Sequence, residues 1–360
     1  MMRRLTSWFA IGALLAVGLA KGPALFAQSK AKAAADTIPE IPYDVVQYFT
    51  KFPASSNLYM GESIGVATNS KGHVFVYTRS GETRLFEFDQ TGNFVREIGQ
   101  GSYSASFAHS VRVDAQDNIW TVDEGSNTIV KFTPDGSKVL MVLGRRPDPA
   151  DQISNMPGGA GLPFGLNKPY SFNRQTDVAW DPQGNIFVSD GYGDARVVKF
   201  DKTGRFVKSV GTRGNGPLQF NTPHTIAVDA KGFVYVGDRG NARVQVLDND
   251  LKYKAVYDNV GNPWAVCISG GPHQYLFASN SWPDSADEAN RSYTGEVYKM
   301  ELDGTIVGKF GKGGKGMKEF STIHQMDCRN PNEIYTAEIN NWRTQKVTLH
   351  PQAMSTGGGK

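Results

Sequence analysis

The chain has 360 residues, of which 40 are glycine and 20% are charged, and its formal net charge is +3 at pH 7. This length allows one to three domains and a large buried core. The many glycines and the absence of long amphipathic helical patterns favour an all-β protein with many turns. A charge this small gives no electrostatic reason to expect nucleic acid or an anionic membrane surface as a partner.

The N-terminal segment has the pattern of a secretory signal peptide. Two arginines precede an apolar run from Trp8 to Ala20, and small residues follow the run as far as Ala27. The apolar run is short for a membrane-spanning helix. We therefore expect residues 1–27 to be removed, which leaves a mature monomer with a formal charge of about zero. The mature protein is expected in the periplasm or outside the cell.

Six copies of one unit occupy residues 43–350, after a flexible segment over 28–42. Each unit has an alternating apolar strand, an Asp-x-x-Gly/Asp-Asn turn, a second strand, a polar turn and a third strand. The clearest copies lie at 64–92, 110–136, 177–204 and 225–250, and two divergent copies begin near Trp264 and Gln325. Six repeats of three or four short strands predict a six-bladed β-propeller with NHL-like repeats, since ring closure removes exposed strand edges.

The last unit lacks an obvious fourth strand of its own. The early stretch YDVVQYF (43–49) is predicted to supply that strand and to close the ring. The insertions at 145–175 and 279–294 are rich in Pro, Gly, Asn and Ser, and we expect them to form loops near one face. Residues 351–360 are expected to be disordered.

The chain has two cysteines, and both lie in apolar runs that resemble strands. For Cys267 and Cys328 the role of small buried hydrophobes is favoured over a disulfide. The exported fold would then be stabilised mainly by its hydrophobic core.

Three histidines occupy one position in every second unit. In a propeller this position, just before the innermost strand, faces the mouth of the central channel, and alternate units lie a third of a turn apart. Three imidazoles should therefore converge, as in a zinc site that keeps one position open. Zinc is the first choice, although iron, copper or nickel could use the same ligands. The histidines are His109, His224 and His324. At the same position the other units carry Ser63, Thr176 and approximately Pro263. The remaining histidines, His73, His273 and His350, do not share this position.

A second set of polar residues follows the second strands on the same rim. Arg79 ends the run VFVYTR, Tyr192 follows VSDG, and Arg239 ends VYVGDR. An arginine offers a planar fork that suits a carboxylate. A dication and two arginines beside Tyr192 would lower the pKa of its phenol, because nearby positive charge favours the phenolate. Each of the three could instead be an ordinary turn residue or a tie between blades.

At these residues the chain resembles the peptidyl-α-hydroxyglycine α-amidating lyase family, whose fold is a six-bladed NHL-like propeller. The resemblance spans about 45–349 and rests on FAHSVRVDAQDNIWTVD, QTDVAWDPQGNIFVSDGYGDARVVKF, FNTPHTIAVDAKGFVYVGDRGNARVQ and, more weakly, STIHQMDCRNPNEIYTAE. It implies that His109, His224 and His324 hold zinc, that Tyr192 is the base, and that Arg79 and Arg239 bind the substrate carboxylate. The implied reaction splits a peptide ending in α-hydroxyglycine into a peptide amide and glyoxylate.

The chain departs from the family at three points. The family has an aspartate after its third histidine that helps to bind structural Ca²⁺, and Gln325 stands there instead. The family's disulfide cysteines are missing, for example at Gly193. No copper monooxygenase domain precedes the propeller, so a separate monooxygenase would have to hydroxylate the small peptide or other carbinolamide precursor.

Two other functions fit the same fold. A lactonase-like hydrolase would hold calcium with axial Glu, Asp and Asn side chains, whereas this axis offers histidines. A non-catalytic NHL-type propeller would bind a protein or glycan on its rim, because fold alone does not determine function.

Overall fold

The structure is a computed structural model, and it describes residues 38–102, 104–146, 168–281 and 295–352. Of the two units into which the chain divides, the second, Ile38–Lys360, contains all described strands. The expected signal peptide, the expected disordered tail beyond residue 352 and most of both insertions lie outside the described residues. Within the described residues there is no helix of the length and apolar character needed to cross a membrane.

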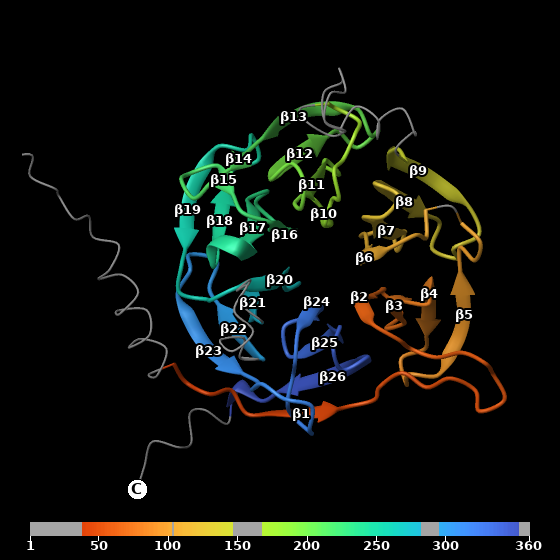
Figure 1. Cartoon of the computed structure of the whole chain (residues 1–360). Helices are drawn as coiled ribbons and strands as arrows, with labels where there is room; N and C mark the ends of the chain where they lie inside the picture. Colours follow the sequence, from red (N-terminus) through yellow and green to blue (C-terminus); the bar gives the residue numbers. More distant parts are fainter. Residues whose placement is uncertain (1–37, 103, 147–167, 282–294, 353–360) are drawn as a thin grey trace, which may run out of the picture. The chain divides into compact units, whose positions relative to one another are not determined.

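Six four-stranded antiparallel sheets surround a central axis in the second unit (Figure 1), which confirms the predicted all-β, six-bladed propeller. In blades 1 to 5 the first strand lies nearest the axis and the following strands pair outward in sequence, whereas blade 6 has the early strand β1 at its outer edge. The first three blades are β2 (Ser63–Thr68), β3 (Val74–Ser80), β4 (Glu82–Phe88) and β5 (Phe94–Ile98); β6 (Ala108–Val113), β7 (Ile119–Asp123), β8 (Thr128–Phe132) and β9 (Val139–Gly144); and β10 (Asp177–Trp180), β11 (Ile186–Asp190), β12 (Arg196–Phe200) and β13 (Phe206–Val210).

The remaining three blades include the one that closes the ring. Blade 4 follows a short parallel pair, β14 (Thr212–Arg213) with β15 (Gln219–Phe220), and has a 3-10 turn, η1 (Arg239–Asn241), after its second strand. The blades are β16 (Pro223–Val228), β17 (Val234–Asp238), β18 (Arg243–Leu247) and β19 (Tyr253–Tyr257); β20 (Pro263–Ile268), β21 (Leu276–Asn280), β22 (Glu296–Met300) and β23 (Ile306–Phe310); and β24 (Ile323–Asn330), β25 (Glu333–Glu338), β26 (Arg343–Leu349) and β1 (Tyr43–Val46).

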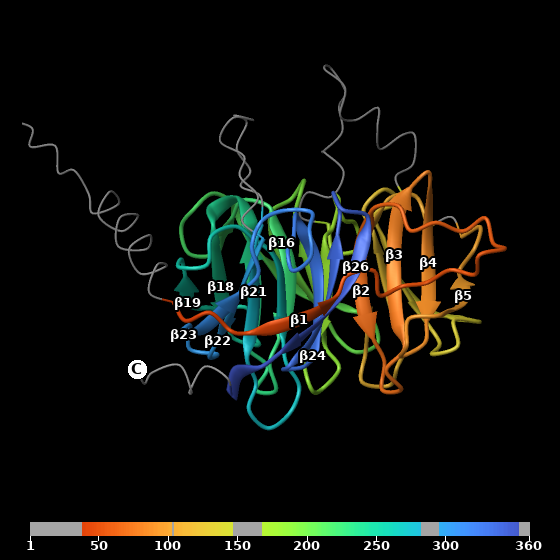
Figure 2. The ribbon, with the colours of Figure 1, turned by 90° about the horizontal axis from the view of Figure 1, so that it is seen from below.

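The early strand β1 closes the ring as predicted. It lies at the outer edge of blade 6, antiparallel to β26 (Figure 2), with Tyr43 opposite Leu349. The chain already packs against the propeller before the expected boundary at residue 43, because Ile41 is buried and its N–H donates to the Lys309 carbonyl of blade 5. Residues 41–46 therefore contact both blade 5 and blade 6.

The repeated aspartate explains the tight turn between the first two strands. Asp114 Oδ1 accepts hydrogen bonds from the N–H groups of Gln116 and Asn118, at 3.0 and 2.9 Å. Asp181 and Asp229 make the same pair of bonds in blades 3 and 4. Such a side chain satisfies backbone donors that the turn leaves unpaired, so the motif fixes where each innermost strand ends.

The hydrophobic core lies between neighbouring blades. One cluster joins Phe75 of blade 1 to Val111 of blade 2, and the next joins Trp120 of blade 2 to Val188 of blade 3. Because each blade buries one face against the next, the positions of the innermost strands are set by their neighbours.

The expectation of two free cysteines is wrong. Cys267 of β20 and Cys328 of β24 form a disulfide, with Cα atoms 6.0 Å apart. The two cysteines are 61 residues apart in the chain, and they meet because blades 5 and 6 place their innermost strands side by side. The disulfide therefore links two blades near the point of ring closure.

Replacing Cys267 and Cys328 together with alanine is expected to lower the free energy of unfolding by about 4 kcal/mol, because the disulfide restricts a long loop in the unfolded chain. Urea unfolding of the oxidised wild type and the double variant measures this difference. A reductant should destabilise the wild type by a similar amount and leave the variant unchanged. Equal stability of the two oxidised proteins would contradict the prediction.

Candidate metal centre and active site

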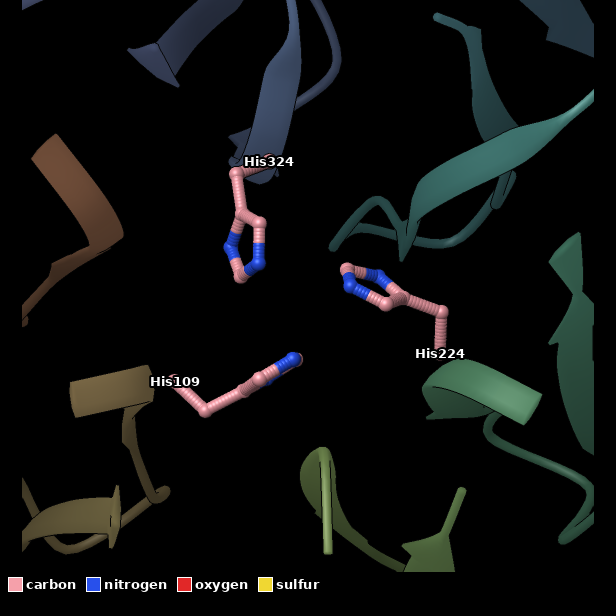
Figure 3. Close-up of side chains that lie close together, drawn as sticks. All are labelled: His109, His224 and His324. Atoms are coloured by element: carbon pink, nitrogen blue, oxygen red, sulfur yellow. The ribbon is translucent and has the colours of Figure 1, made fainter. Parts of the chain in front are cut away.

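Three imidazoles meet on the axis of the propeller (Figure 3). His109, His224 and His324 come from β6, β16 and β24, the innermost strands of blades 2, 4 and 6. The ring centroids lie 4.6–4.7 Å apart, and one ring nitrogen from each side chain lies within 4.8 Å of the others. All three residues are at most 3% exposed. The predicted convergence of the three histidines is therefore present in the structure.

Each histidine sits at a β-bulge at the start of its strand. The register between the first and second strands shifts across His109, between Ala108 and Ser110. It shifts in the same way across His224 and across His324. A bulge turns one side chain out of the alternating pattern of the sheet. Here it releases each imidazole from the strand pairing and leaves it facing the axis.

Buried carboxylates hold the segments that lead into the histidines. Each carboxylate ends the second strand of a histidine-bearing blade and accepts a hydrogen bond from a backbone N–H two or three residues before the histidine. The pairs are Asp123 with Phe107 N (2.7 Å), Asp238 with Asn221 N (2.7 Å) and Glu338 with Ser321 N (3.1 Å). These bonds fix the backbone from which each imidazole extends.

The blades between the histidines orient the rings. Each Nδ1 faces a backbone carbonyl of the next blade: His109 faces Thr176 O at 2.5 Å, His224 faces Trp264 O at 2.6 Å, and His324 faces Ile64 O at 2.8 Å. A carbonyl only accepts, so each Nδ1 donates and each Nε2 carries the lone pair. The other ring nitrogen of a metal-bound histidine is commonly held in this way.

The protonation and hydrogen bonding of the rings fit a metal ion. Burial, the largest cause, lowers the pKa of His109, His224 and His324 well below 6.5, so the rings are neutral at pH 7. The buried Nε2 atoms of His224 and His324 have no hydrogen-bond partner among the described residues. Buried nitrogens without partners are costly unless something binds them. Three neutral imidazoles are a donor set suited to zinc and to other divalent transition metals.

Tyr192 and Arg239 stand beside this centre, as the sequence predicted. The Tyr192 hydroxyl lies 3.3 Å from His109 Nε2, and Arg239 Nη1 lies 3.5 Å from the same hydroxyl. The Arg239 guanidinium also stacks over the Trp264 ring at 4.1 Å, and that ring lies 5.1 Å from His224. Tyrosine, arginine and histidines therefore form one connected group.

The side chains around Tyr192 do not by themselves lower the pKa of its phenol. Burial raises the pKa of the Tyr192 phenol, although the positive charge of Arg239 acts in the opposite direction. The nearby carboxylate of Glu124 raises the pKa further. The side chains alone therefore keep Tyr192 protonated at neutral pH.

Arg79 reaches the same rim from blade 1. Its Nη1 donates to the carbonyl of Ala108, next to His109, at 3.4 Å, and its Nε donates to Glu62 at 3.1 Å. Its guanidinium stacks over the Phe107 ring at 4.2 Å. The positive charge of Arg79 contributes to the lowered pKa of His109 and of His324, so it lies within electrostatic reach of the metal centre.

The sequence prediction missed Glu124, which belongs to the same site. Glu124 is 3% exposed and lies 3.6 Å from Arg79 Nη1 and 3.3 Å from Arg174 Nη2. Asp123, the residue before Glu124, pairs with Ala108 at the start of β6. In blade 1, Thr78, the residue before Arg79, pairs with Ser63 at the start of β2. Glu124 is therefore the blade 2 counterpart of Arg79, and a comparison of that register across the repeats would have found it.

The Gln325 side chain, which stands where the family has its calcium-binding aspartate, is engaged with backbone groups. The Gln325 Oε1 accepts hydrogen bonds from the N–H groups of Val66 and Val111, at 3.0 and 3.1 Å, and its Nε2 donates to the Val111 carbonyl at 2.8 Å. Through these bonds Gln325 links blades 6, 1 and 2.

Comparison with known proteins confirms the resemblance to NHL-repeat proteins and amidating lyases. The NHL repeat family model matches residues 220–247. The chain is 30% identical to mouse NHL repeat-containing protein 3 over 58% of this chain and 58% of that protein. It is 28% identical to the Caenorhabditis elegans probable peptidyl-alpha-hydroxyglycine alpha-amidating lyase pgal-1 over 53% of this chain and 57% of that protein. It is 30% identical to rat peptidylglycine alpha-amidating monooxygenase over 78% of this chain and 28% of that protein. The chain thus spans less than two thirds of the length of these relatives.

Solved structures share the fold at low sequence identity. A streptogramin B lyase structure superposes with a TM-score of 0.52 at 14% identity, covering 86% of this chain and 98% of that chain. A Bacteroides thetaiotaomicron protein of unknown function superposes with a TM-score of 0.56 at 13% identity, covering 86% and 77%. These similarities support the propeller fold.

Replacing His109 with alanine is expected to remove a bound transition metal, because two imidazoles hold a divalent ion much more weakly than three. Elemental analysis of the purified wild type should give about one metal ion per chain, and the variant should give almost none. His273→Ala is the matched control, since His273 is exposed on the surface and is bonded to Glu301. Equal metal content in the wild type and His109→Ala would contradict the assignment.

The metal-free protein is expected to lose stability as the pH falls below 6.5. The pKa values of the three histidines are lower in the folded protein than in the unfolded chain. Below pH 6.5 the unfolded chain therefore binds more protons than the folded protein, and the free energy of unfolding falls as the pH is lowered. Three such groups give a slope of up to about 4 kcal/mol per pH unit. Urea unfolding from pH 7 to pH 5 measures it. In His109→Gln the slope should be smaller by about a third; an unchanged slope would contradict the prediction.

Proposed function

We propose that this protein is a metal-dependent lyase that cleaves a C-terminal α-hydroxyglycine into a terminal amide and glyoxylate. The observation that carries the proposal is the group of three neutral, buried imidazoles next to Tyr192 and Arg239. The relatives include a probable amidating lyase at 28% identity, and its name supports the same reaction class. The metal proposed is zinc.

The reaction breaks the bond between the amide nitrogen and the hydroxyl-bearing carbon. The hydroxyl proton leaves, the carbon becomes the aldehyde of glyoxylate, and the nitrogen gains a proton to become the primary amide. A bound divalent ion would act as a Lewis acid that makes the substrate hydroxyl more acidic. His109, His224 and His324 would hold this ion through Nε2.

Tyr192 is proposed to accept the hydroxyl proton. Its hydroxyl borders His109, and a base must lie within hydrogen-bond reach of the proton that it takes. Because burial raises the pKa of Tyr192, the chain's own groups do not supply a phenolate, and the base would have to be activated in the loaded enzyme.

Arg239 and Arg79 are proposed to bind the carboxylate of hydroxyglycine. Arg239 is 7% exposed and contacts Tyr192, so an anion there would be held next to the base. Arg79 approaches from the His109 side. Charge-assisted hydrogen bonds from two guanidinium groups would orient the substrate and withdraw it from water.

The protein is further proposed to be exported and to act after a separate hydroxylating enzyme. The pattern of residues 1–27 supports export. The direct test of function is glyoxylate release from a hydroxyglycine-terminated peptide by the zinc-loaded protein. Absence of glyoxylate from fully loaded protein would refute the lyase and favour a propeller that only binds partners.

Tyr192→Phe is expected to lower kcat by about 10²–10⁴-fold, because it removes a positioned base. Its metal content should remain about one ion per chain, since the phenol is not among the three ligands. Steady-state glyoxylate release together with elemental analysis measures both quantities. A variant that keeps its metal and its full rate would exclude Tyr192 as the base.

A further inference from the structure

A third arginine stands at the mouth of the candidate site. The Arg174 guanidinium lies 4.6 Å from the centre of the Tyr192 ring, while its side chain is 55% exposed. The backbone of Arg174 is fixed on both sides, since its N–H donates to Asn127 Oδ1 at 2.7 Å and its carbonyl accepts from Tyr192 N at 3.3 Å. This arginine is thus firmly held next to the catalytic tyrosine and is open to solvent.

The buried carboxylate of Glu124 determines where this guanidinium lies. Arg174 Nη2 donates to Glu124 Oε1 at 3.3 Å, and Glu124 also pairs with Arg79. Arg79 has a second acidic partner in Glu62, whereas Glu124 is the single acidic partner of Arg174 among the described residues. One carboxylate shared between two guanidinium groups leaves Arg174 able to bind a further anion.

The position of Arg174 suits the residue that precedes hydroxyglycine in a peptide. Tyr192 presents its hydroxyl to the metal centre and its ring to Arg174. The Tyr192 side chain thus contacts both the candidate metal centre and the Arg174 guanidinium, and one residue of an extended peptide advances about 3.3–3.6 Å. A side chain one residue before the cleaved bond would therefore come within reach of the guanidinium.

We propose that Arg174 is a specificity residue that selects substrates with an aspartate or glutamate directly before the hydroxyglycine. This inference rests on the proposed lyase function and adds the class of peptide on which the site acts. Glu124 is the positioning residue for Arg174, because it holds the guanidinium against the face of Tyr192.

The test compares two peptides that differ only in charge, N-acetyl-Phe-Glu-hydroxyglycine and N-acetyl-Phe-Gln-hydroxyglycine. The wild type should show a kcat/KM about tenfold higher for the glutamate peptide, the size expected for one charge-assisted hydrogen bond. In Arg174→Gln this ratio should fall to about one. In Arg174→Glu it should fall below one, because the new carboxylate repels the substrate side chain.

Arg205→Gln is the matched control, since it removes the same charge from an exposed turn in blade 3 that does not contact the site. This control should keep the wild-type ratio. A wild-type ratio near one, or a tenfold preference that survives Arg174→Gln, would overturn the proposal. Thermal unfolding of each variant confirms that it is folded.

Binding of unreactive peptides separates this proposal from the proposed function. Calorimetry should show tighter binding of N-acetyl-Phe-Glu-Gly than of N-acetyl-Phe-Gln-Gly to the metal-loaded wild type, and equal binding of the two to Arg174→Gln. If neither hydroxylated peptide releases glyoxylate but this binding preference is observed, the lyase function fails and the acidic specificity stands. Equal binding of both peptides to the wild type overturns the specificity.

Discussion

The hydrogen bond from each histidine Nδ1 to a carbonyl of the next blade is the interaction on which the candidate site depends. Blades 2, 4 and 6 supply the imidazoles, and blades 3, 5 and 1 supply the acceptors at Thr176, Trp264 and Ile64. All six blades therefore take part in orienting three rings. Each blade takes part in one of the three bonds, so a shift of one blade would disturb one of them and move one Nε2 atom relative to the other two.

The fold and the histidine cluster could be predicted because both depend on repetition. A turn aspartate at one place in the second, third and fourth units aligns these copies, and this alignment places His109 and His224 at equivalent positions without a structure. The bulge at each histidine could not be predicted in the same way. It is a local change of register between two paired strands, and residue types alone do not specify it.

Two other features depend on contacts between distant parts of the chain. The disulfide joins Cys267 to Cys328 across 61 residues, and apolar neighbours in the sequence made each cysteine look like ordinary core. The residue type alone does not identify Glu124 as part of the site, because an acidic side chain does not suit a carboxylate substrate. Its role becomes visible only next to Arg79 and Arg174, which it holds.

The ring closure through β1 has a consequence for how the site comes into being. His324 obtains its acceptor from Ile64, so the seam between the last blade and the first passes through the metal centre. A nascent chain would not have a complete ligand set until its sixth blade has folded and docked against the first. Metal binding at this candidate site would therefore require a complete chain, and a protease cut within blade 6 would disrupt both the set of three histidines and the ring closure.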